Sequence, residues 1–422
     1  MRCEILSYLR RIGQEHLSEG LDSLSEDGLL RFWQELQGLD DSLLYKQREV
    51  LGRDPLCAVA YEPLKAKEEK SECARGLQQL SEGRVGCLIL AGGQGTRLGF
   101  SAPKGTFPIS PVTGKSLFQL ALERVGAASH RAGRALPVAI MTSPLNHAET
   151  LQFLQEHAWF GLSQTQVQLF AQRMLPFLDN QGNWCLAGAG QIAQGPSGNG
   201  EALRGLMQQG IWQQWRDAHV EAVVVIPIDN PLADPFDVEL CGLQAAHASE
   251  VVIKAVTRLS AEESVGVIVQ AEGGIRVIEY FELAQTDEAV HVANINTFCL
   301  SMEWIERVAL RPVPWHIARK RVPLRHQVAE IYKYETFLFD FLDYAERAHV
   351  TLAPREHCYA PLKQAEGAKG IESVKQALLA RDRRVFAELF GLPVPQRPFE
   401  LPARFLYPID AGNAPEIETG AT

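Results

Sequence analysis

Residues 88–100 read LILAGGQGTRLGF, an apolar run that leads directly into a loop rich in glycine. Glycine lets a backbone turn sharply and bring its N–H groups close to an anion without interference from a Cβ atom. Arg97 follows the glycines, and Lys104 comes shortly afterwards in the segment SAPKG. A flexible loop with two nearby cations suits a polyphosphate, although an ordinary tight turn between a strand and a helix has a similar sequence.

Two well-known nucleotide loops do not fit this spacing. A dinucleotide-binding fingerprint would need glycine where Leu98 stands. The Gly-Lys-Ser at 114–116 lacks the first glycine of a P-loop, because Ile109 occupies that position. The sequence therefore argues against a dinucleotide-dependent oxidoreductase and against a P-loop enzyme.

Outward from the glycine loop, short β-branched runs alternate with helical stretches. The strand-like runs are GCLIL (86–90), PVAIMT (137–142), VQLFAQ (167–172), EAVVVIPI (221–228) and VVIKAV (251–256). Such alternation predicts an α/β fold with a mixed, mostly parallel sheet covered by helices. Ligands bind at the carboxyl ends of the strands in such sheets, so the loops after GCLIL and EAVVVIPI should carry the chemistry.

The chain divides by composition into three predicted regions: a helical region at 1–82, a catalytic core at 83–353 and a small C-terminal domain at 354–422. Within the core, the β-rich segments VGVIV, IRVIEYFEL and VANINTFCLS predict either one half of a cleft or an inserted sheet. Apolar spacing predicts helices over Tyr332–Ala348 and over 372–390.

Charge and composition narrow the class of protein. The chain has 422 residues, with 41 Lys and Arg against 51 Asp and Glu, a net charge of −10 that argues against broad capture of nucleic acid or an anionic membrane. No apolar run approaches the roughly 18 residues that span a bilayer, and no secretory signal is visible. Eight cysteines without a CxxC motif predict reduced thiols and a soluble, cytoplasmic protein. The sequence leaves the oligomeric state open.

A series of segments then carries a specific resemblance. In order they read LAGGQGTRLG, PKG, FAQRMLPFLD, GPSGNGEAL, IPIDNPLADP, ESVGVIV, VIEYFE, NINTF and YAPLKQA, spread over residues 86 to 370. They resemble the eukaryote-type UDP-sugar pyrophosphorylases, in particular the UDP-N-acetylglucosamine (UDP-N-acetylhexosamine) pyrophosphorylases. The resemblance implies a Rossmann-like nucleotidyltransferase core between smaller terminal domains. The implied reaction joins UTP and an N-acetylhexosamine 1-phosphate to give a UDP-sugar and pyrophosphate, with Mg²⁺ as cofactor.

The resemblance also implies roles for individual residues. The catalytic cations would be Arg97, Lys104 and Lys363. The residues expected to bind the UTP moiety are Leu90, Ala91, Gly92, Gly93, Gln172, Gly198 and Asp229. Those expected to bind the sugar are Asn199, Gly266, Glu279, Asn294 and Asn296. Asp229 would also bind Mg²⁺, because it ends a buried strand where a carboxylate can meet a metal carried by phosphates; a helix cap is the competing interpretation.

Three departures from the family pattern leave alternatives open. Arg173 and Glu201 stand where the family has glycine, and Ser197 replaces the usual Asp. A related enzyme that makes UDP-glucose, a UTP–glucose-1-phosphate uridylyltransferase, is therefore the second hypothesis. A non-catalytic UTP-binding or scaffold relative is the third, although the retained cations argue against it. Asp234 and Asp237 are interpreted as cap or surface residues.

Overall fold

The strands predicted around the glycine loop lie in a ten-stranded sheet in the computed structural model, which describes residues 1–52, 61–64, 66, 71–280, 282–283, 291–325 and 327–407. Four of its strands are parallel neighbours, in the order β4 (Val167–Ala171), β3 (Val138–Thr142), β2 (Val85–Leu90) and β9 (Ala222–Pro227). Every residue of β2 and β3 is buried, as expected for strands covered on both faces. The predicted α/β fold is confirmed.

The β-rich segments extend the same sheet. Strand β13 (Val292–Ser301) runs antiparallel to β9 and to β10 (Val251–Thr257), and β16 (Ala348–Leu352) pairs in parallel with β10. Strand β11 (Val267–Ala271) pairs with β1 (Tyr61–Pro63), β12 (Gly274–Ile278) and β13. Antiparallel pairing brings the first residues of β13 to the carboxyl end of β9. These segments therefore do not form a separate inserted sheet.

Helices connect and flank these strands. They are α4 (Cys73–Ser81), η3 (Thr96–Leu98), η4 (Lys104–Thr106), α5 (Leu117–Ala132), α6 (His147–Glu156), η5 (Ala158–Gly161), α7 (Glu201–Gln208), α8 (Ile211–Asp217), α9 (Val238–His247), α10 (Met302–Val308), η6 (Leu338–Tyr344), α11 (Arg355–Cys358), α12 (Ile371–Phe390) and η7 (Ala403–Leu406). The buried side of α5, with Phe118 and Leu122, packs in one hydrophobic core with β2 and β9. Ser116 caps the first turn of α5 by accepting a hydrogen bond from the Gln119 N–H at 3.1 Å.

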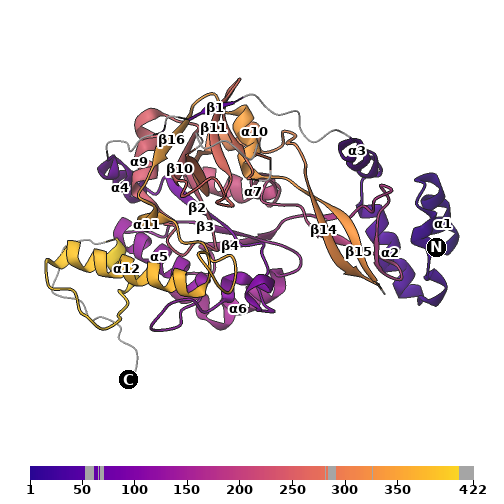
Figure 1. Cartoon of the computed structure of the whole chain (residues 1–422), viewed down its shortest axis with the longest axis horizontal. Helices are drawn as coiled ribbons and strands as arrows, with labels where there is room; N and C mark the ends of the chain where they lie inside the picture. Colours follow the sequence, from indigo (N-terminus) through magenta and orange to yellow (C-terminus); the bar gives the residue numbers. More distant parts are fainter. Residues whose placement is uncertain are drawn as a thin grey trace. The chain divides into compact units, whose positions relative to one another are not determined.

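A second compact unit consists of Met1–Val59, Arg173–Glu201 and Val313–Phe337. Its elements are α1 (Arg2–Arg11), η1 (Glu15–Ser18), η2 (Leu21–Ser23), α2 (Glu26–Gly38), α3 (Asp41–Leu51), β5 (Met174–Pro176), β6 (Leu186–Gly188), β7 (Gln191–Ile192), β8 (Gln194–Pro196), β14 (His316–Leu324) and β15 (Gln327–Glu335). Figure 1 shows β14 and β15 as a long two-stranded ribbon. The hydrophobic core of this unit joins Leu9 and Phe32 of the helices to Trp184 and to Tyr334 of the ribbon.

The two units divide the chain differently from the three predicted regions. The remaining segments, Ala60–Gln172, Ala202–Pro312 and Leu338–Thr422, form the unit that contains the large sheet. Helix α4 belongs to this unit because it lies against α9 (Figure 1), where a Cβ on Gly76 would come within 1.7 Å of the Val238 carbonyl oxygen. Parts of the predicted N-terminal region (53–60, 65 and 67–70) and the chain after Tyr407 lie outside the described residues.

The helix predicted over Tyr332–Ala348 is wrong. Its first residues belong to β15 and pair with β14, for example Tyr334 with Ile317, and only a 3-10 helix, η6, follows. The helix predicted over 372–390 is confirmed as α12. Among the described residues, no helix is long and apolar enough to cross a membrane.

Candidate functional site

The candidate site lies at the edge of the sheet where the four parallel strands end. The glycine loop follows β2, and Asp229 follows β9, its direct parallel neighbour, in which Leu90 pairs with Pro227. Gln172 follows β4 on the other side of β3. Leu90 is buried as the last residue of β2 and Ala91 begins the loop. Parallel pairing therefore brings these loops to one edge, as the sequence predicted.

The glycine loop is held by a buried side chain that the sequence did not point to. Asn146 donates from Nδ2 to the carbonyl oxygens of Ala91 at 3.0 Å and Gly93 at 3.2 Å. Its Oδ1 accepts the backbone N–H of Ser143 at 2.8 Å, which fixes the orientation of the amide. The Ser-Pro-Leu-Asn sequence after β3 is good turn chemistry, and that was the available signal.

Gly92 and Gln172 lie against each other. A Cβ built on Gly92 would come within 2.0 Å of Gln172 Nε2, so position 92 has no room for a side chain while Gln172 keeps its place. The backbone N–H of Gln172 donates to the Thr142 carbonyl at 2.9 Å, and the residue is buried. Two residues predicted to bind the UTP moiety are thus neighbours.

The two predicted cations of the loop differ in exposure. Arg97 lies in η3 and is exposed, whereas Lys104 begins η4 and is half-buried. The Lys104 N–H donates to the Gly93 carbonyl at 3.2 Å, so the two segments are tied together. Burial lowers the pKa of the Lys104 ammonium, and the positive charges of Lys363 and Arg97 act in the same direction.

Asp229 joins the two predicted lysines. Its Oδ2 lies 2.5 Å from Lys363 Nζ and 3.4 Å from Lys104 Nζ. Burial opposes ionisation of this carboxyl, but the ammonium groups of Lys363 and Lys104 outweigh it and hold the pKa of Asp229 below its usual value. Two cations and one carboxylate leave a surplus of positive charge, and Arg97 adds to it. The cluster is suited to binding phosphate oxygens.

The segment that carries Lys363 is fastened to the loop after β9. The Leu362 N–H donates to the Asp229 carbonyl at 2.7 Å, and Lys104 Nζ donates to the Leu362 carbonyl at 3.0 Å. Residues far apart in the chain are thereby held in one cluster.

Asn230 completes this attachment and was missed by the sequence analysis. Its Nδ2 donates to the Cys358 carbonyl at 2.7 Å, and its Oδ1 accepts the Ala360 N–H at 3.0 Å. The side chain is only 2% exposed. No local pattern could identify this role, because the partners of Asn230 come from a segment well over one hundred residues later in the sequence.

Four of the residues predicted to bind the sugar also lie together, namely Gly266, Glu279, Asn294 and Asn296. A Cβ on Gly266 would lie 3.4 Å from Glu279 Oε1, and the Gly266 carbonyl accepts the Asn294 N–H at 2.8 Å. Asn294 and Asn296 bond to each other through Nδ2 and Oδ1 at 3.1 Å, and Asn296 has a left-handed φ of 55°. Burial raises the pKa of the Tyr359 hydroxyl, and the Asp229 and Glu279 carboxylates act in the same direction.

Gly198 and Asn199 belong to the other compact unit, so they are described within it. Gly198 has a φ of 96°, and a Cβ there would come within 2.3 Å of the Thr336 carbonyl oxygen. The turn chemistry of Pro-Ser-Gly-Asn is therefore realised at this point.

Two of the departures from the family pattern explain each other. Arg173 Nε and Nη2 each lie 2.7 Å from a carboxylate oxygen of Glu201, a bidentate ion pair. Arg173 and Glu201 both stand where the family pattern has glycine, and together they introduce complementary charges. Nothing in the structure explains Ser197 in place of Asp.

Asp237 is a helix cap, as predicted, since its Oδ1 accepts the Leu240 N–H at 3.0 Å at the start of α9. It is not a surface residue, because it also pairs with the buried Lys254 at 2.5 Å. Asp234 accepts the Phe236 N–H at 2.9 Å in the loop before this helix.

Comparisons with known proteins show which proteins this chain is similar to. A family model described as UTP–glucose-1-phosphate uridylyltransferase matches residues 41–382. UDP-N-acetylhexosamine pyrophosphorylase-like protein 1 of Mus musculus is 30% identical, with 90% of this chain and 84% of that protein covered.

Two solved structures are also similar to this chain. The uridine diphosphate N-acetylglucosamine pyrophosphorylase of Trypanosoma brucei, in complex with an inhibitor, superimposes with a TM-score of 0.80 at 25% identity, covering 92% of this chain and 86% of that chain. UDP-glucose pyrophosphorylase of Leishmania major gives a TM-score of 0.63 at 18% identity over 76% of this chain and 72% of that chain, which shows a shared fold alone.

Proposed function

This chain belongs to the family of UTP–glucose-1-phosphate uridylyltransferases, and we infer that it transfers the uridylyl group of UTP to an N-acetylhexosamine 1-phosphate. The products are a UDP-N-acetylhexosamine, UDP-N-acetylglucosamine or UDP-N-acetylgalactosamine, and pyrophosphate. The names of the similar proteins support the N-acetylated sugar, since the UDP-glucose enzyme is the more distant match.

The observation that carries this proposal is the position of Asp229 between Lys104 and Lys363, next to the glycine loop. Uridylyl transfer proceeds by attack of the sugar phosphate on the α-phosphorus in line with the departing pyrophosphate. Such a reaction needs positioned substrates and neutralised charge more than proton transfer. A cationic cluster at the carboxyl edge of the sheet supplies both.

In this mechanism each part of the site has a distinct task. The loop amides, Arg97 and Lys104 would hold the triphosphate and stabilise the charge on the departing pyrophosphate. Lys363 would stabilise the negative charge that concentrates where the two phosphates meet. The Asp229 carboxylate compensates the two ammonium groups before phosphate oxygens arrive.

Asp229 is also the proposed magnesium ligand. Its Oδ1 is buried and has no hydrogen-bond partner among the described residues, so one carboxylate oxygen remains for a cation while Oδ2 faces the lysines. No group of three or more His, Cys, Asp or Glu residues suited to a metal occurs in the described ranges. A site with the single carboxylate of Asp229 fits Mg²⁺, which is commonly bound by one or two carboxylates together with substrate phosphates. When bound, the ion would supply positive charge to the phosphate oxygens.

Asp229→Asn tests the magnesium proposal. The substitution keeps the shape of the side chain and removes its charge, so the Mg²⁺ concentration required for half-maximal rate should rise and turnover should fall strongly. In the native protein, excess EDTA should stop turnover and added Mg²⁺ should restore it. An Asp229→Asn protein with the native rate at limiting Mg²⁺ would show that the carboxylate is not the ligand.

The reaction itself is tested by measuring pyrophosphate release with UTP and each of the glucose, N-acetylglucosamine and N-acetylgalactosamine 1-phosphates. The N-acetylated sugars should give the higher kcat/KM, and ATP, GTP and CTP should replace UTP poorly. A preference for glucose 1-phosphate would establish the second hypothesis instead. UTP binding without pyrophosphate release from any of the sugars would establish the non-catalytic one.

A further inference from the structure

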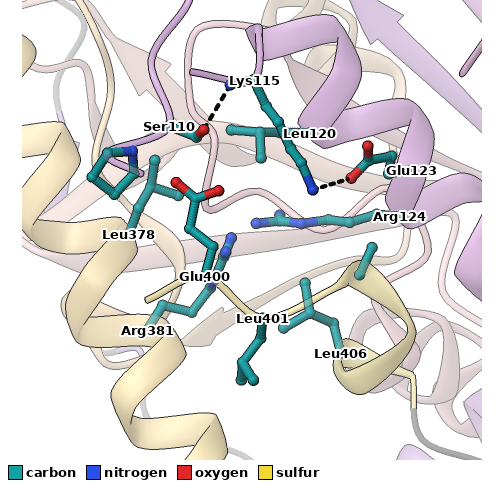
Figure 2. Close-up of a pocket in the computed structure, with 12 residues that line it drawn as sticks. Ser110, Lys115, Leu120, Glu123, Arg124, Leu378, Arg381, Glu400, Leu401 and Leu406 are labelled. Atoms are coloured by element: carbon teal, nitrogen blue, oxygen red, sulfur yellow. Dashed lines mark hydrogen bonds and ion pairs between the residues drawn. The ribbon is translucent and has the colours of Figure 1, made fainter. Parts of the chain in front are cut away.

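A small pocket lies apart from the lysine cluster, in the unit that contains the large sheet. Figure 2 shows the guanidinium groups of Arg124 and Arg381 pointing into it, with Lys115 and Glu400 at its wall. Arg124 comes from α5 and Arg381 from α12, and Glu400 comes from the segment that follows that helix. The pocket has a volume of about 20 Å³, which is more than a single water molecule needs.

Both arginines are buried, but only Arg381 forms an ion pair within the described ranges. Arg124 is 4% exposed and donates only to backbone carbonyls, those of Ala233 at 2.8 Å and Pro231 at 2.7 Å; within the described ranges it forms no ion pair. Burial and the nearby Arg381 lower the pKa of the Arg124 guanidinium, whereas the Asp234 and Asp382 carboxylates act in the opposite direction without outweighing them. A buried guanidinium that forms no direct ion pair keeps an unfavourable cost of desolvation, so an anion bound beside it would stabilise it.

Arg381 has one donor group left over. It is 7% exposed, and Nε and Nη2 both bind the Asp382 carboxylate, at 2.8 and 2.7 Å. Its Nη1 is buried and has no hydrogen-bond partner in the described part of the chain. A donor in this state normally indicates a water or ion bound at that place.

The carboxylates near the pocket already have partners. Glu400 accepts the Val112 N–H at 2.6 Å and the Thr113 hydroxyl at 2.5 Å. Glu123 pairs with Lys115 at 3.1 Å. Neither forms an ion pair with Arg124 or Arg381.

We propose that this pocket binds a small tetrahedral oxyanion of the phosphate or sulfate type between Arg124 and Arg381. Several oxygens on one centre can accept hydrogen bonds from two guanidinium groups on different helices, which suits such an ion. Because Arg124 also holds the Pro231 and Ala233 carbonyls, the anion would join α12 to the loop that begins at Asp229. The site is distinct from the one that binds the substrates.

The experiment measures the unfolding temperature of the full-length protein against inorganic phosphate, with chloride at equal ionic strength as reference. We expect a saturable rise of at least about 2 °C with phosphate and a smaller one with chloride. The rise should disappear in Arg381→Met and persist in Arg383→Met, which changes an exposed arginine of the same helix. It should also persist in Lys363→Ala, in which phosphate binding at the lysine cluster is weakened.

Three results would overturn the proposal: no phosphate effect in the native protein, an equal effect in Arg381→Met, or loss of the effect in Lys363→Ala. If Arg381→Met does not fold, crystals of the native protein grown in sulfate decide the question. Tetrahedral density between the two guanidinium groups would support the site, and an anion-free pocket would refute it. None of these readouts requires enzymatic activity, so they are independent of the proposed reaction.

Discussion

At the scale of single residues, Lys363 is the most direct test of the site. Its ammonium lies 2.5 Å from Asp229 Oδ2 in a half-exposed position, where a phosphate can reach it. Lys363→Ala should lower kcat by about 10²-fold or more with a smaller change in KM, because the charge is needed most in the transition state.

Steady-state kinetics with UTP and N-acetylglucosamine 1-phosphate measure this effect. Lys375→Ala is the control, since Lys375 lies on α12 and pairs with the exposed Glu372 at 3.4 Å. An unchanged kcat in Lys363→Ala would place the catalytic charge on another lysine.

Gly92 tests whether Gln172 reads the nucleotide base. In Gly92→Ala the new Cβ would push the Gln172 amide aside without forcing the backbone to move, because the colliding atom is the end of a flexible side chain. The ratio of kcat/KM for UTP to that for CTP should fall by about tenfold, since a displaced amide no longer selects uracil.

A double-mutant cycle makes this prediction specific. In a Gln172→Ala protein the collision no longer exists, so adding Gly92→Ala should change the UTP/CTP ratio little further. Independent, additive effects of the two substitutions would mean that Gly92 does not act through Gln172.

At the scale of elements, the attachment of the Lys363 segment to the loop after β9 depends on Asn230. Asn230→Ala removes hydrogen bonds to Cys358 and Ala360, and leaves buried backbone groups without partners. We expect kcat to fall by about tenfold or more, because a small displacement of a catalytic charge has a large effect on rate.

The effect of Asn230→Ala should vanish in a Lys363→Ala background, which separates positioning from general destabilisation. Asn180→Ala, on an exposed turn, serves as the control. A lower unfolding temperature with an unchanged kcat would show that Asn230 has only a structural role.

The helix predicted over Tyr332–Ala348 shows how pairing between elements overrides a local pattern. Aromatic residues at Tyr332 and Tyr334 fit a pleated strand as well as a helix. The nine-residue pairing of β15 with β14 satisfies the backbone groups of this segment. Spacing of apolar residues alone could not distinguish the two outcomes, because the partner strand lies elsewhere in the sequence.

At the scale of the whole molecule, Asp234 gives a prediction about stability and pH. Burial and the neighbouring Asp237 raise the pKa of Asp234 from 3.8 to about 6. Between these values the unfolded chain has lost this proton while the folded protein keeps it, so the free energy of unfolding falls as pH rises. The loss of stability caused by Asp234 should be complete above pH 6 and absent below pH 3.8, the pKa in the unfolded chain.

The measurement compares the native protein with Asp234→Asn by chemical denaturation at pH 4 and pH 7. Other titrating groups affect both proteins alike, so their difference isolates Asp234. The native protein should lose stability relative to Asp234→Asn between the two pH values. A difference that is the same at both would mean that Asp234 titrates as in an unfolded chain.

The sequence by itself determined the α/β class, the parallel strands and the glycine loop with Arg97 and Lys104 close to it in the chain. These features are local: buried strands need β-branched runs, a close backbone approach needs glycine, and ligands bind where parallel strands end. Each leaves a pattern within a few neighbouring residues. A resemblance to a known family then supplied the order of the remaining segments.

Only the tertiary structure decided what ordinary polar residues do. Asn230 and Arg124 have no distinctive sequence context, and Asn146 has only the turn chemistry of its segment; the roles of all three come from partners on other elements. The same holds for the pairing of Arg173 with Glu201 and for the division into two units. A buried hydrogen bond or ion pair is defined by two groups at once, and chain folding, not local sequence, brings those groups within reach of each other.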